Sequence, residues 1–322
     1  MLSILSKIDP VQQRGYLLRL LPALLLILSV TPALAPNSKQ TIPENKLQEN
    51  KIPRLGFDLY YRTAGNGHPF LILSGGPGDD SDYMAPVALE AAKFGQAILL
   101  EQRGTGRSIP PAIDNTTINL ATYLGDMEAL RMQLKVEQWT LIGHSAGGLL
   151  AMYYAAAHPD RVEKLILLDS APIASEFLRP LQANMLDRLS PQERDRLTVL
   201  EKSSALDAPA EIAQINARAL FFDRQIGAQV AATMGNAWHA EVGRLLGNEM
   251  SAPGYDLRPR LEEFERPVLV VNGRQNPMDP LMAYETSVAF KNSTLRFIDR
   301  AGHMPWFEQQ KQFADALDDF LK

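Results

Sequence analysis

The chain has 322 residues, 46% hydrophobic and 21% charged, which is enough to bury the core of one large domain with an insertion or of two smaller domains. Its net charge of −5 and isoelectric point near 5.6 leave no basic face for a phosphate backbone, so nucleic acid is not an expected partner. The absence of cysteine excludes disulfides, thiolate chemistry and cysteine-ligated metals.

Residues 1–35 have the pattern of a targeting segment. Basic residues precede an apolar run over residues 20–30, and small residues follow that run. The run is short for a membrane span, so we expect a signal peptide, with an uncleaved anchor or a buried amphipathic helix as alternatives. This predicts an exported protein, periplasmic or secreted, that contacts a membrane only through this segment if the segment is retained.

Residues 36–54 are polar and contain three prolines, so they cannot bury enough apolar surface to fold alone. We interpret them as a linker. The folded part is expected to begin with an alternating strand at Phe57–Arg62 and to continue with an apolar strand at Pro69–Leu73.

Short apolar strands and helices then alternate along the chain. The expected strands are Gln96–Leu100, Trp139–Ile142, Lys164–Leu168, Pro267–Val271 and Thr294–Ile298. The expected helices are Asn119–Lys135, Gly148–His158 and Pro305–Leu321. This alternation is typical of a parallel sheet that is covered on both faces.

The alternation is interrupted over residues 172–266, where helical patterns broken by prolines include no convincing buried strand. We therefore predict an α/β fold, a mostly parallel sheet with helices on both faces and an inserted helical cap. Its core consists of residues 55–171 and 267–322, with the cap between them.

A Gly-x-Ser-x-Gly sequence, Gly143-His144-Ser145-Ala146-Gly147, stands at the junction between one of these strands and a helix of small residues. This context is that of a nucleophile elbow, a turn so tight that the flanking positions require glycine. We predict that the turn holds Ser145 in a strained conformation with its hydroxyl exposed. An ordinary glycine-rich turn with a solvated serine is the alternative.

His303 is the candidate general base. A serine hydroxyl is a poor nucleophile unless a base accepts its proton during attack. Among the five histidines, His303 follows the last strand, at the carboxyl ends of the parallel strands, where open α/β sheets place their sites. The order of nucleophile and then histidine along the chain also fits.

Two backbone amides are predicted to form an oxyanion hole. Ala146 follows the nucleophile directly, and the second donor is expected in the loop Ser74-Gly75-Gly76-Pro77-Gly78. Proline has no N–H to donate, so Gly76 is our choice. Each such donor commonly contributes about 3 kcal/mol to transition-state stabilisation.

A fourth segment, Glu101-Gln102-Arg103-Gly104-Thr105-Gly106-Arg107-Ser108, accompanies these motifs. Together with Gly75–Gly78, the elbow and Gly302-His303, it resembles the α/β-hydrolase superfamily, specifically its proline iminopeptidase-like branch. The resemblance covers about residues 55–322, including the cap. It implies the α/β-hydrolase fold and a catalytic triad built on Ser145, and it makes the fourth segment mostly architectural, with Arg103 as a structural charge near the site.

Two departures from the branch concern the substrate. Ser74 stands where the branch usually has a histidine. The segment Trp238-His239-Ala240-Glu241 resembles only loosely the cap motif whose acidic residue helps to bind a free amino group. Trp238 and Glu241 are therefore the candidate substrate-binding residues, and the choice between an ester and a peptide bond stays open.

The third triad position departs as well, because the superfamily usually has an aspartate where this chain has Asn276. An asparagine can orient a histidine but supplies no negative charge, and the equivalent change in a serine protease lowers turnover about 10⁴-fold. We predict that Asn276 takes the orienting position, with Asp169 and Asp279 as candidate charge donors. Asp279 precedes a proline and is interpreted first as a helix N-cap.

These features predict a serine hydrolase that forms an acyl-enzyme on Ser145 and acts on a small ester, an amide or a short peptide, including aminopeptidase activity of the proline iminopeptidase type. No metal or organic cofactor is implied. The alternative is a catalytically weak or inactive protein that binds a small molecule or a partner, and Asn276 is its sole support. A dehalogenase is disfavoured, because that chemistry needs a carboxylate at the elbow.

Overall fold

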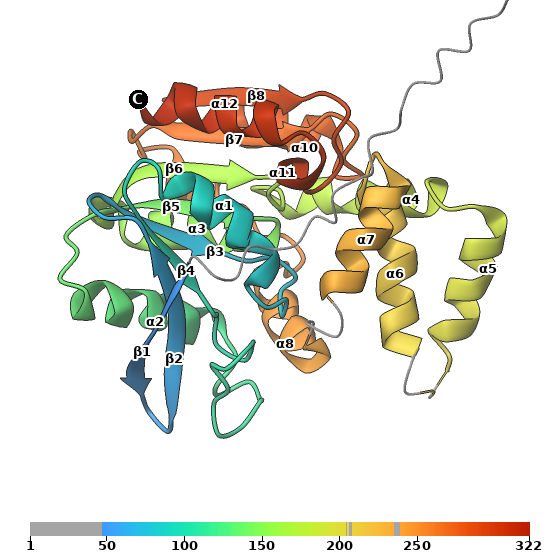
Figure 1. Cartoon of the computed structure of the whole chain (residues 1–322), viewed down its shortest axis with the longest axis horizontal. Helices are drawn as coiled ribbons and strands as arrows, with labels where there is room; N and C mark the ends of the chain where they lie inside the picture. Colours follow the sequence, from blue (N-terminus) through green and yellow to red (C-terminus); the bar gives the residue numbers. More distant parts are fainter. Residues whose placement is uncertain (1–46, 204, 206–207, 235–238) are drawn as a thin grey trace, which may run out of the picture. The chain divides into compact units, whose positions relative to one another are not determined.

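The computed structural model describes residues 47–322 apart from 204, 206–207 and 235–238, and these residues form one eight-stranded sheet (Figure 1). The strand order is β1-β2-β4-β3-β5-β6-β7-β8. The strands are β1 (Gln48–Arg54), β2 (Phe57–Ala64), β3 (Pro69–Leu73), β4 (Gln96–Leu100), β5 (Trp139–His144), β6 (Val162–Leu168), β7 (Val268–Gly273) and β8 (Ser293–Ile298). β3 to β8 pair in parallel, which confirms the predicted mostly parallel sheet.

Successive residues of the central strands face opposite sides of the sheet, as the two-residue period of a strand requires. In β3, Leu71 and Leu73 belong to one buried apolar cluster, whereas Phe70 and Ile72 belong to another. Both sides are buried, so these strands read as continuous apolar runs in the sequence rather than as alternating ones.

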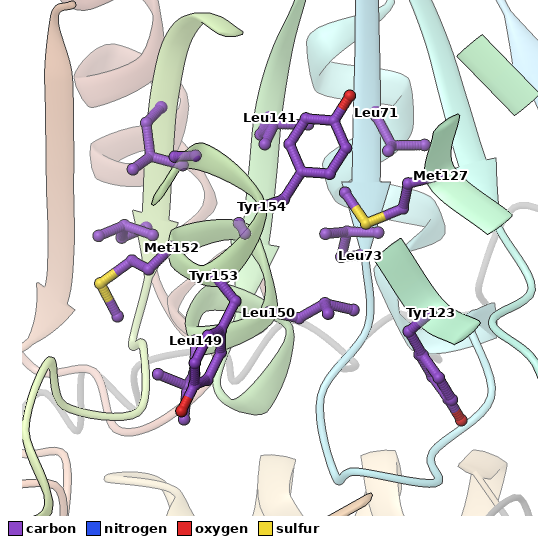
Figure 2. Close-up of a cluster of buried hydrophobic side chains, with 14 of the residues drawn as sticks. Leu71, Leu73, Tyr123, Met127, Leu141, Leu149, Leu150, Met152, Tyr153 and Tyr154 are labelled. Atoms are coloured by element: carbon purple, nitrogen blue, oxygen red, sulfur yellow. The ribbon is translucent and has the colours of Figure 1, made fainter. Parts of the chain in front are cut away.

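Helices cover both clusters, as predicted. The first cluster packs under α2 (Leu120–Gln133) and α3 (Ala146–Ala157), and Figure 2 shows part of it around α3. The second packs under α1 (Ala85–Ala91), α11 (Pro305–Glu308) and α12 (Gln310–Leu321). The predicted last helix is thus two helices separated at Gln309, whose backbone leaves the helical region (φ −137°, ψ 57°).

β1 corrects the predicted linker over residues 36–54. It pairs antiparallel with β2, in a register that runs from Gln48–Thr63 to Arg54–Phe57. Ile52 is buried in the first cluster, and the polar neighbours lie at the sheet edge, where charged residues and proline are tolerated. This polar stretch is held by its pairing with β2, by the buried Ile52 and by the ion pair between Arg54 and the buried Asp126. Residues 36–46 lie outside the described part of the chain.

Helix α2 begins after Asn119, whose side chain accepts the Thr122 N–H in a capping box. Its buried face is not purely apolar. Asp126 and Arg131 are buried on it, whereas Met132 is 63% exposed. Asp126 pairs with Arg54 and Arg103 from other segments, and Arg131 pairs with Glu128 of the same helix. An apolar pattern does not reveal such pairs.

The segment between β6 and β7 is helical in its described part, and we call residues 172–266 the inserted segment. It contains α4 (Arg179–Asp187), α5 (Pro191–Leu200), α6 (Ala208–Leu220), α7 (Arg224–Met234), α8 (Ala240–Met250) and α9 (Arg258–Leu261). Residues of α5 and α6 form a small apolar cluster of their own. Helix α8 instead buries Val242, Leu246 and Met250 in the first cluster of the main core. The domain boundaries at 171 and 266 stay predictions.

Candidate active site

Ser145 lies at the turn from β5 to α3 with φ 53° and ψ −121°, a backbone conformation that a non-glycine residue adopts only when its surroundings enforce it. A Cβ on Gly143 would lie 2.3 Å from the Gly147 carbonyl oxygen, and one on Gly147 would lie 2.3 Å from that of Ser74. Both positions therefore require glycine. Ser145 is only 8% exposed, less open than expected, because the loop at Gly75 packs against it.

His303 follows β8 in a loop that is fixed to two other parts of the molecule. Its N–H donates to the Leu220 carbonyl at the end of α6 (2.7 Å), and its carbonyl accepts the Nε2–H of His144 (3.0 Å). The two imidazole rings are 4.5 Å apart between centroids. Because His144 directly precedes Ser145, the fold places His303 beside the elbow.

Burial sets the charge state of His303. It lowers the pKa of this imidazole to about 4, so the ring is neutral at pH 7 and able to accept a proton. Its Nδ1 atom is buried and has no hydrogen-bond partner within the described residues. A buried ring nitrogen of this kind normally has a partner, so Nδ1 indicates a missing contact.

Asn276 and Asp169 lie in contact at the carboxyl ends of β6 and β7. Asn276 Nδ2 donates to Asp169 Oδ1 (2.7 Å), and Asn276 Oδ1 accepts the Met278 N–H (3.1 Å). The side-chain hydrogen bonds of Asn276 therefore lead to Asp169, to Asn272 of β7 and to its own loop, and none joins it to His303 within the described chain. Sequence reasoning named both residues but not their contact.

Asp169 is fully buried, with a φ of 42°. Its Oδ1 also accepts the Gly273 N–H (2.8 Å), whereas Oδ2 is buried without a partner among the described residues. Burial raises the pKa of this carboxyl well above its usual range, and the Gly273 N–H and the Asn276 amide oppose that shift. A Cβ on Gly273 would lie 1.9 Å from the Gly302 carbonyl oxygen. Gly273, which binds Asp169, therefore packs against the loop that carries His303.

Asp279 is the N-cap of α10 (Pro280–Val288). Its Oδ1 accepts the Leu281 N–H (2.8 Å), and Pro280 occupies the first turn. This is the capping arrangement that the sequence indicates, and it employs the carboxylate at the helix terminus.

Residues 74–78 are called the oxyanion loop here after their predicted role, and within them the Gly75 and Gly76 amides differ. Gly75 N–H donates to Tyr83 Oη (2.6 Å), and Pro77 has no N–H. Neither Gly76 N–H nor Ala146 N–H has a protein partner within the described chain. Gly76 has a φ of 103°, which only glycine adopts without strain. Both amides remain available to a ligand.

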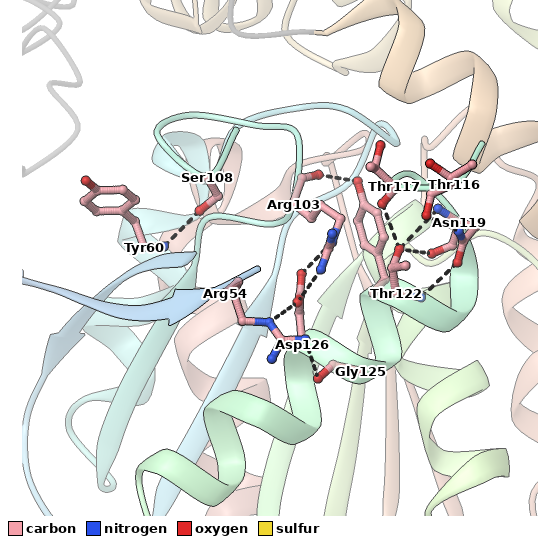
Figure 3. Close-up of polar contacts among 11 residues, drawn as sticks. Arg54, Tyr60, Arg103, Ser108, Thr116, Thr117, Asn119, Thr122, Gly125 and Asp126 are labelled. Carbon is pink, nitrogen blue, oxygen red and sulfur yellow. Dashed lines mark hydrogen bonds and ion pairs between the residues drawn. The ribbon is translucent and has the colours of Figure 1, made fainter. Parts of the chain in front are cut away.

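The fourth motif supports this loop rather than the chemistry. Gln102 Nε2 donates to the backbone carbonyl and to the hydroxyl of Ser74 (both 2.8 Å), so Ser74 anchors the loop at its start. Arg103 makes two bonds to the buried Asp126 (2.7 and 2.8 Å), which Arg54 also contacts (Figure 3). The Arg103 guanidinium is therefore engaged in an internal ion pair.

A small pocket lies beside the oxyanion loop. It is lined by four residues of that loop and by residues of four other segments: Ser74, Gly75, Pro77, Gly78, Gln102, Thr105, Tyr123, Ala146, Gly147, Leu150, Leu246 and Met250. Leu246 and Met250 come from α8, so the inserted segment supplies one wall of this pocket.

Of the two candidate substrate-binding residues, Glu241 is not brought to this site. Glu241 is about half exposed in the first turn of α8, and its carboxylate pairs with Arg244 (2.6 Å). Trp238 lies outside the described residues. Within the described residues, no group of three or more His, Asp and Glu side chains is arranged to hold a metal ion.

Sequence reasoning missed three groups around His303. Tyr83 binds both Gly75 and His144, Gln275 Oε1 is a further buried acceptor without a partner in the described part, and Glu308 accepts the Gly302 N–H (2.6 Å). A tyrosine, a glutamine and a helical glutamate have no motif signal of their own. Only their contacts across the fold mark them.

Comparisons with known proteins agree with this architecture. A family model described as alpha/beta hydrolase fold matches residues 68–310. Proline iminopeptidase of Lactobacillus delbrueckii subsp. lactis is 28% identical over 299 residues, covering 86% of this chain and 98% of that enzyme. The proline iminopeptidase of Clostridium botulinum is 26% identical over 294 residues, with the same coverage.

Solved structures are similar in fold. An alpha/beta fold family hydrolase of Bacillus anthracis has a TM-score of 0.69 at 20% identity, covering 85% of this chain and 99% of that one. Proline iminopeptidase of Mycobacterium smegmatis has a TM-score of 0.67 at 18% identity, covering 85% and 97%. Together with the sequence relatives, these matches confirm the resemblance to α/β hydrolases of the proline iminopeptidase-like branch.

The prediction of an exported protein is contradicted by the same relatives. The match accounts for 98% of the Lactobacillus enzyme with 86% of this chain, which leaves no room in that enzyme for a leader comparable to residues 1–35. We therefore withdraw the prediction of export, and with it the membrane contact through an N-terminal anchor. Residues 1–35 themselves lie outside the described part. In the part that is described, we find no helix with the length and apolar character that crossing a membrane requires.

Proposed function

We propose that this chain, which belongs to the α/β-hydrolase fold family, is a serine hydrolase with Ser145 as its nucleophile. The observation that carries the proposal is the strained Ser145 beside two backbone amides, Gly76 and Ala146, that have no protein partner in the described residues. The proline iminopeptidase relatives support hydrolytic activity.

In the proposed reaction, Ser145 Oγ attacks the carbonyl carbon of the substrate while its proton passes to His303. The carbonyl π electrons move onto oxygen, and the amides of Gly76 and Ala146 donate hydrogen bonds to the resulting oxyanion. The intermediate expels the alcohol or amine, which takes the proton from His303 and leaves an ester on Ser145. Water then repeats the sequence and releases the acid.

Asp169 is the acid of this proposal, and Asn276 holds it. Asp169 Oδ2 and His303 Nδ1 are both buried without partners in the described structure, so one hydrogen bond between them would satisfy an acceptor and a donor at once. Burial raises the pKa of Asp169, and the Asn276 amide opposes that rise by favouring the ionised form, which is the form that supports an imidazolium. Asn276 thus acts on His303 through Asp169.

The proposed substrates are small esters, amides or short peptides, and the inserted segment acts as a cap that selects among them. The relatives favour a peptide with an amino-terminal proline. Glu241 is omitted from the proposed site because its carboxylate pairs with Arg244 at the surface. The pocket walls contributed by Leu246 and Met250 favour an apolar group beside the oxyanion loop.

The test is covalent labelling of the full chain by a fluorophosphonate, together with hydrolysis of p-nitrophenyl acetate and of prolyl p-nitroanilide. We expect labelling and hydrolysis in the unmodified chain and neither in Ser145→Ala. Ser287→Ala, which removes a buried hydroxyl from α10, is the matched control and keeps both. Prolyl amide turnover would extend the proposal to iminopeptidase activity, whereas ester turnover alone would restrict it to an esterase.

An unmodified chain that is folded but neither labelled nor active on either substrate would contradict the proposal. The alternative, an inactive α/β-hydrolase-fold protein that binds a small molecule, would then take its place.

A further inference from the structure

Three hydrogen bonds in series cross the site behind Ser145. The reaction proposed above does not use them. Gly75 N–H donates to Tyr83 Oη (2.6 Å), Tyr83 Oη bonds His144 Nδ1 (2.8 Å), and His144 Nε2 bonds the His303 carbonyl oxygen (3.0 Å). Tyr83 is 0% exposed and His144 is 2% exposed. This series of hydrogen bonds therefore joins the oxyanion loop to the loop that carries His303 through the protein interior.

The donor and acceptor of each hydrogen bond follow from which atoms can carry a hydrogen. A carbonyl oxygen can only accept, so His144 Nε2 carries a hydrogen and donates it to His303. A neutral imidazole has one N–H, so His144 Nδ1 accepts the hydroxyl hydrogen of Tyr83. Burial lowers the pKa of His144 well below its ordinary value, which keeps the ring neutral and this direction fixed. The Gly75 N–H then donates to the remaining lone pairs of Tyr83 Oη.

Packing holds the two side chains in place. Trp306 stacks on the Tyr83 ring (centroids 6.3 Å apart, planes at 28°) and meets His144 edge-on (4.9 Å, 90°). The Trp306 indole N–H also donates to the Tyr83 carbonyl (3.3 Å). A side chain so confined has little rotamer freedom, so its hydrogen bonds fix the groups at both ends.

We propose that Tyr83 and His144 are positioning residues that hold the Gly76 amide and the His303 ring in register across Ser145. The proposal rests on the serine hydrolase function proposed above. Tyr83 occupies the Gly75 amide and thereby orients the next peptide, whose N–H at Gly76 is left for the oxyanion. His144 fixes the backbone of His303 and hence the origin of its side chain. The oxyanion hole and the base are thus assembled as one unit.

The first experiment removes one hydroxyl. Tyr83→Phe keeps the ring between His144 and Trp306 but removes two of the three hydrogen bonds. Tyr154→Phe is the matched control, because Tyr154 is also 0% exposed and loses a bond to Glu128, on the side of α3 that packs against Trp139 at the start of β5. Both variants are studied in the full chain with p-nitrophenyl acetate, and the melting temperature is measured for each.

For Tyr83→Phe we expect kcat to fall about 10- to 100-fold with KM within about threefold, because the donor geometry matters most in the transition state. Fluorophosphonate labelling should slow by a similar factor. Tyr154→Phe should lower the melting temperature and leave kcat unchanged. A kcat for Tyr83→Phe equal to that of the unmodified chain, or an equal loss of kcat in both variants, would overturn the inference.

A second pair of variants tests the positioning role if Tyr83→Phe does not fold. His144→Gln offers one donor and one acceptor at a similar reach, whereas His144→Leu fills similar space without either. Higher kcat in His144→Gln than in His144→Leu is the expected rescue. Equal kcat in the two would show that packing alone matters at this position and would overturn the inference.

Failure of this inference is distinguishable from failure of the proposed function. If the unmodified chain is neither labelled nor active, the serine hydrolase proposal fails and the positioning role fails with it. If the unmodified chain is active and Tyr83→Phe matches it, only the positioning role is lost.

Discussion

Asp169 follows β6 and Asp279 lies in the segment after the neighbouring β7, but the two carboxylates differ in burial and in hydrogen-bond partners. Asp279 is at the start of α10, where its carboxylate accepts the Leu281 N–H. Asp169 is completely buried, with Oδ1 held by Gly273 and Asn276 and Oδ2 left without a partner in the described part of the chain. A buried carboxylate with one oxygen fixed and the other unpaired is a poor arrangement for stability alone, because desolvation costs more than two bonds return.

Asp169→Asn should therefore lower kcat about 10³- to 10⁴-fold, since an amide that accepts the Gly273 N–H presents N–H groups to His303 and favours the wrong tautomer. Asp279→Asn is the control, because asparagine caps helices as well as aspartate does, and it should keep kcat within about twofold. Steady-state hydrolysis of a short-chain ester measures both. A kcat for Asp169→Asn within about tenfold of the unmodified chain would remove Asp169 from the proposed triad and direct attention to Gln275 Oε1.

At the scale of elements, α2 is attached to the rest of the fold by charge as well as by apolar packing. Asp126 is 2% exposed on its inner face and receives Arg54 from β1 and Arg103 from the loop after β4 (Figure 3). Tyr123, one turn earlier, donates its hydroxyl to the Arg103 carbonyl. A helix, an edge strand and a loop thus meet at one carboxylate.

Asp126→Asn should lower the free energy of unfolding by about 3 kcal/mol, because it leaves two arginines without their buried counter-charge. Asp318→Asn is the control, since the pair between Asp318 and Lys322 is exposed and such pairs contribute about 0–1 kcal/mol. Denaturant unfolding gives both values. We expect kcat per folded molecule to stay unchanged in both variants. An equal loss of unfolding free energy in the two would show that the Asp126 ion pairs are dispensable.

At the scale of the whole molecule, the loop that carries His303 is fixed by the inserted segment. His303 N–H donates to the Leu220 carbonyl (2.7 Å), and Glu308 accepts the Gly302 N–H (2.6 Å) and the Asp223 N–H (2.7 Å). Leu220 and Asp223 lie at the junction of α6 and α7. The same segment also provides α8, which packs against the core beside the oxyanion loop. The part of the chain proposed to select the substrate therefore also holds the proposed base.

Glu308→Ala should cost about 1–3 kcal/mol of folding free energy, because the buried Gly302 amide loses its acceptor. It should also lower kcat about tenfold, since the loop that carries His303 loses an anchor. Glu263→Ala, which removes an exposed partner of Lys291, is the control and should change neither quantity. A normal kcat in Glu308→Ala, despite the loss of stability, would separate the anchoring of the loop from catalysis.

The sequence by itself determined what depends on neighbours along the chain. Continuous apolar runs identified the central strands because parallel strands are buried on both faces, and the Asp279-Pro280 pair identified a helix start because capping is local. Gly143 indicated the turn at Ser145 because the space it leaves is needed by the Gly147 carbonyl within the turn itself. The choice of the Ser145, His303 and Gly76 roles remains a prediction that the experiments above test.

Only the tertiary structure decided what depends on residues far apart in the chain. Asn276 meets Asp169 across 107 positions and Tyr83 meets His144 across 61, and no local pattern records such contacts. The same holds for β1, whose polar sequence is ordered by pairing with β2, and for Asp126, whose burial depends on arginines from two other segments. Local periodicity reports the average environment of an element, whereas the partner of a single buried polar group is set by which elements the fold brings together.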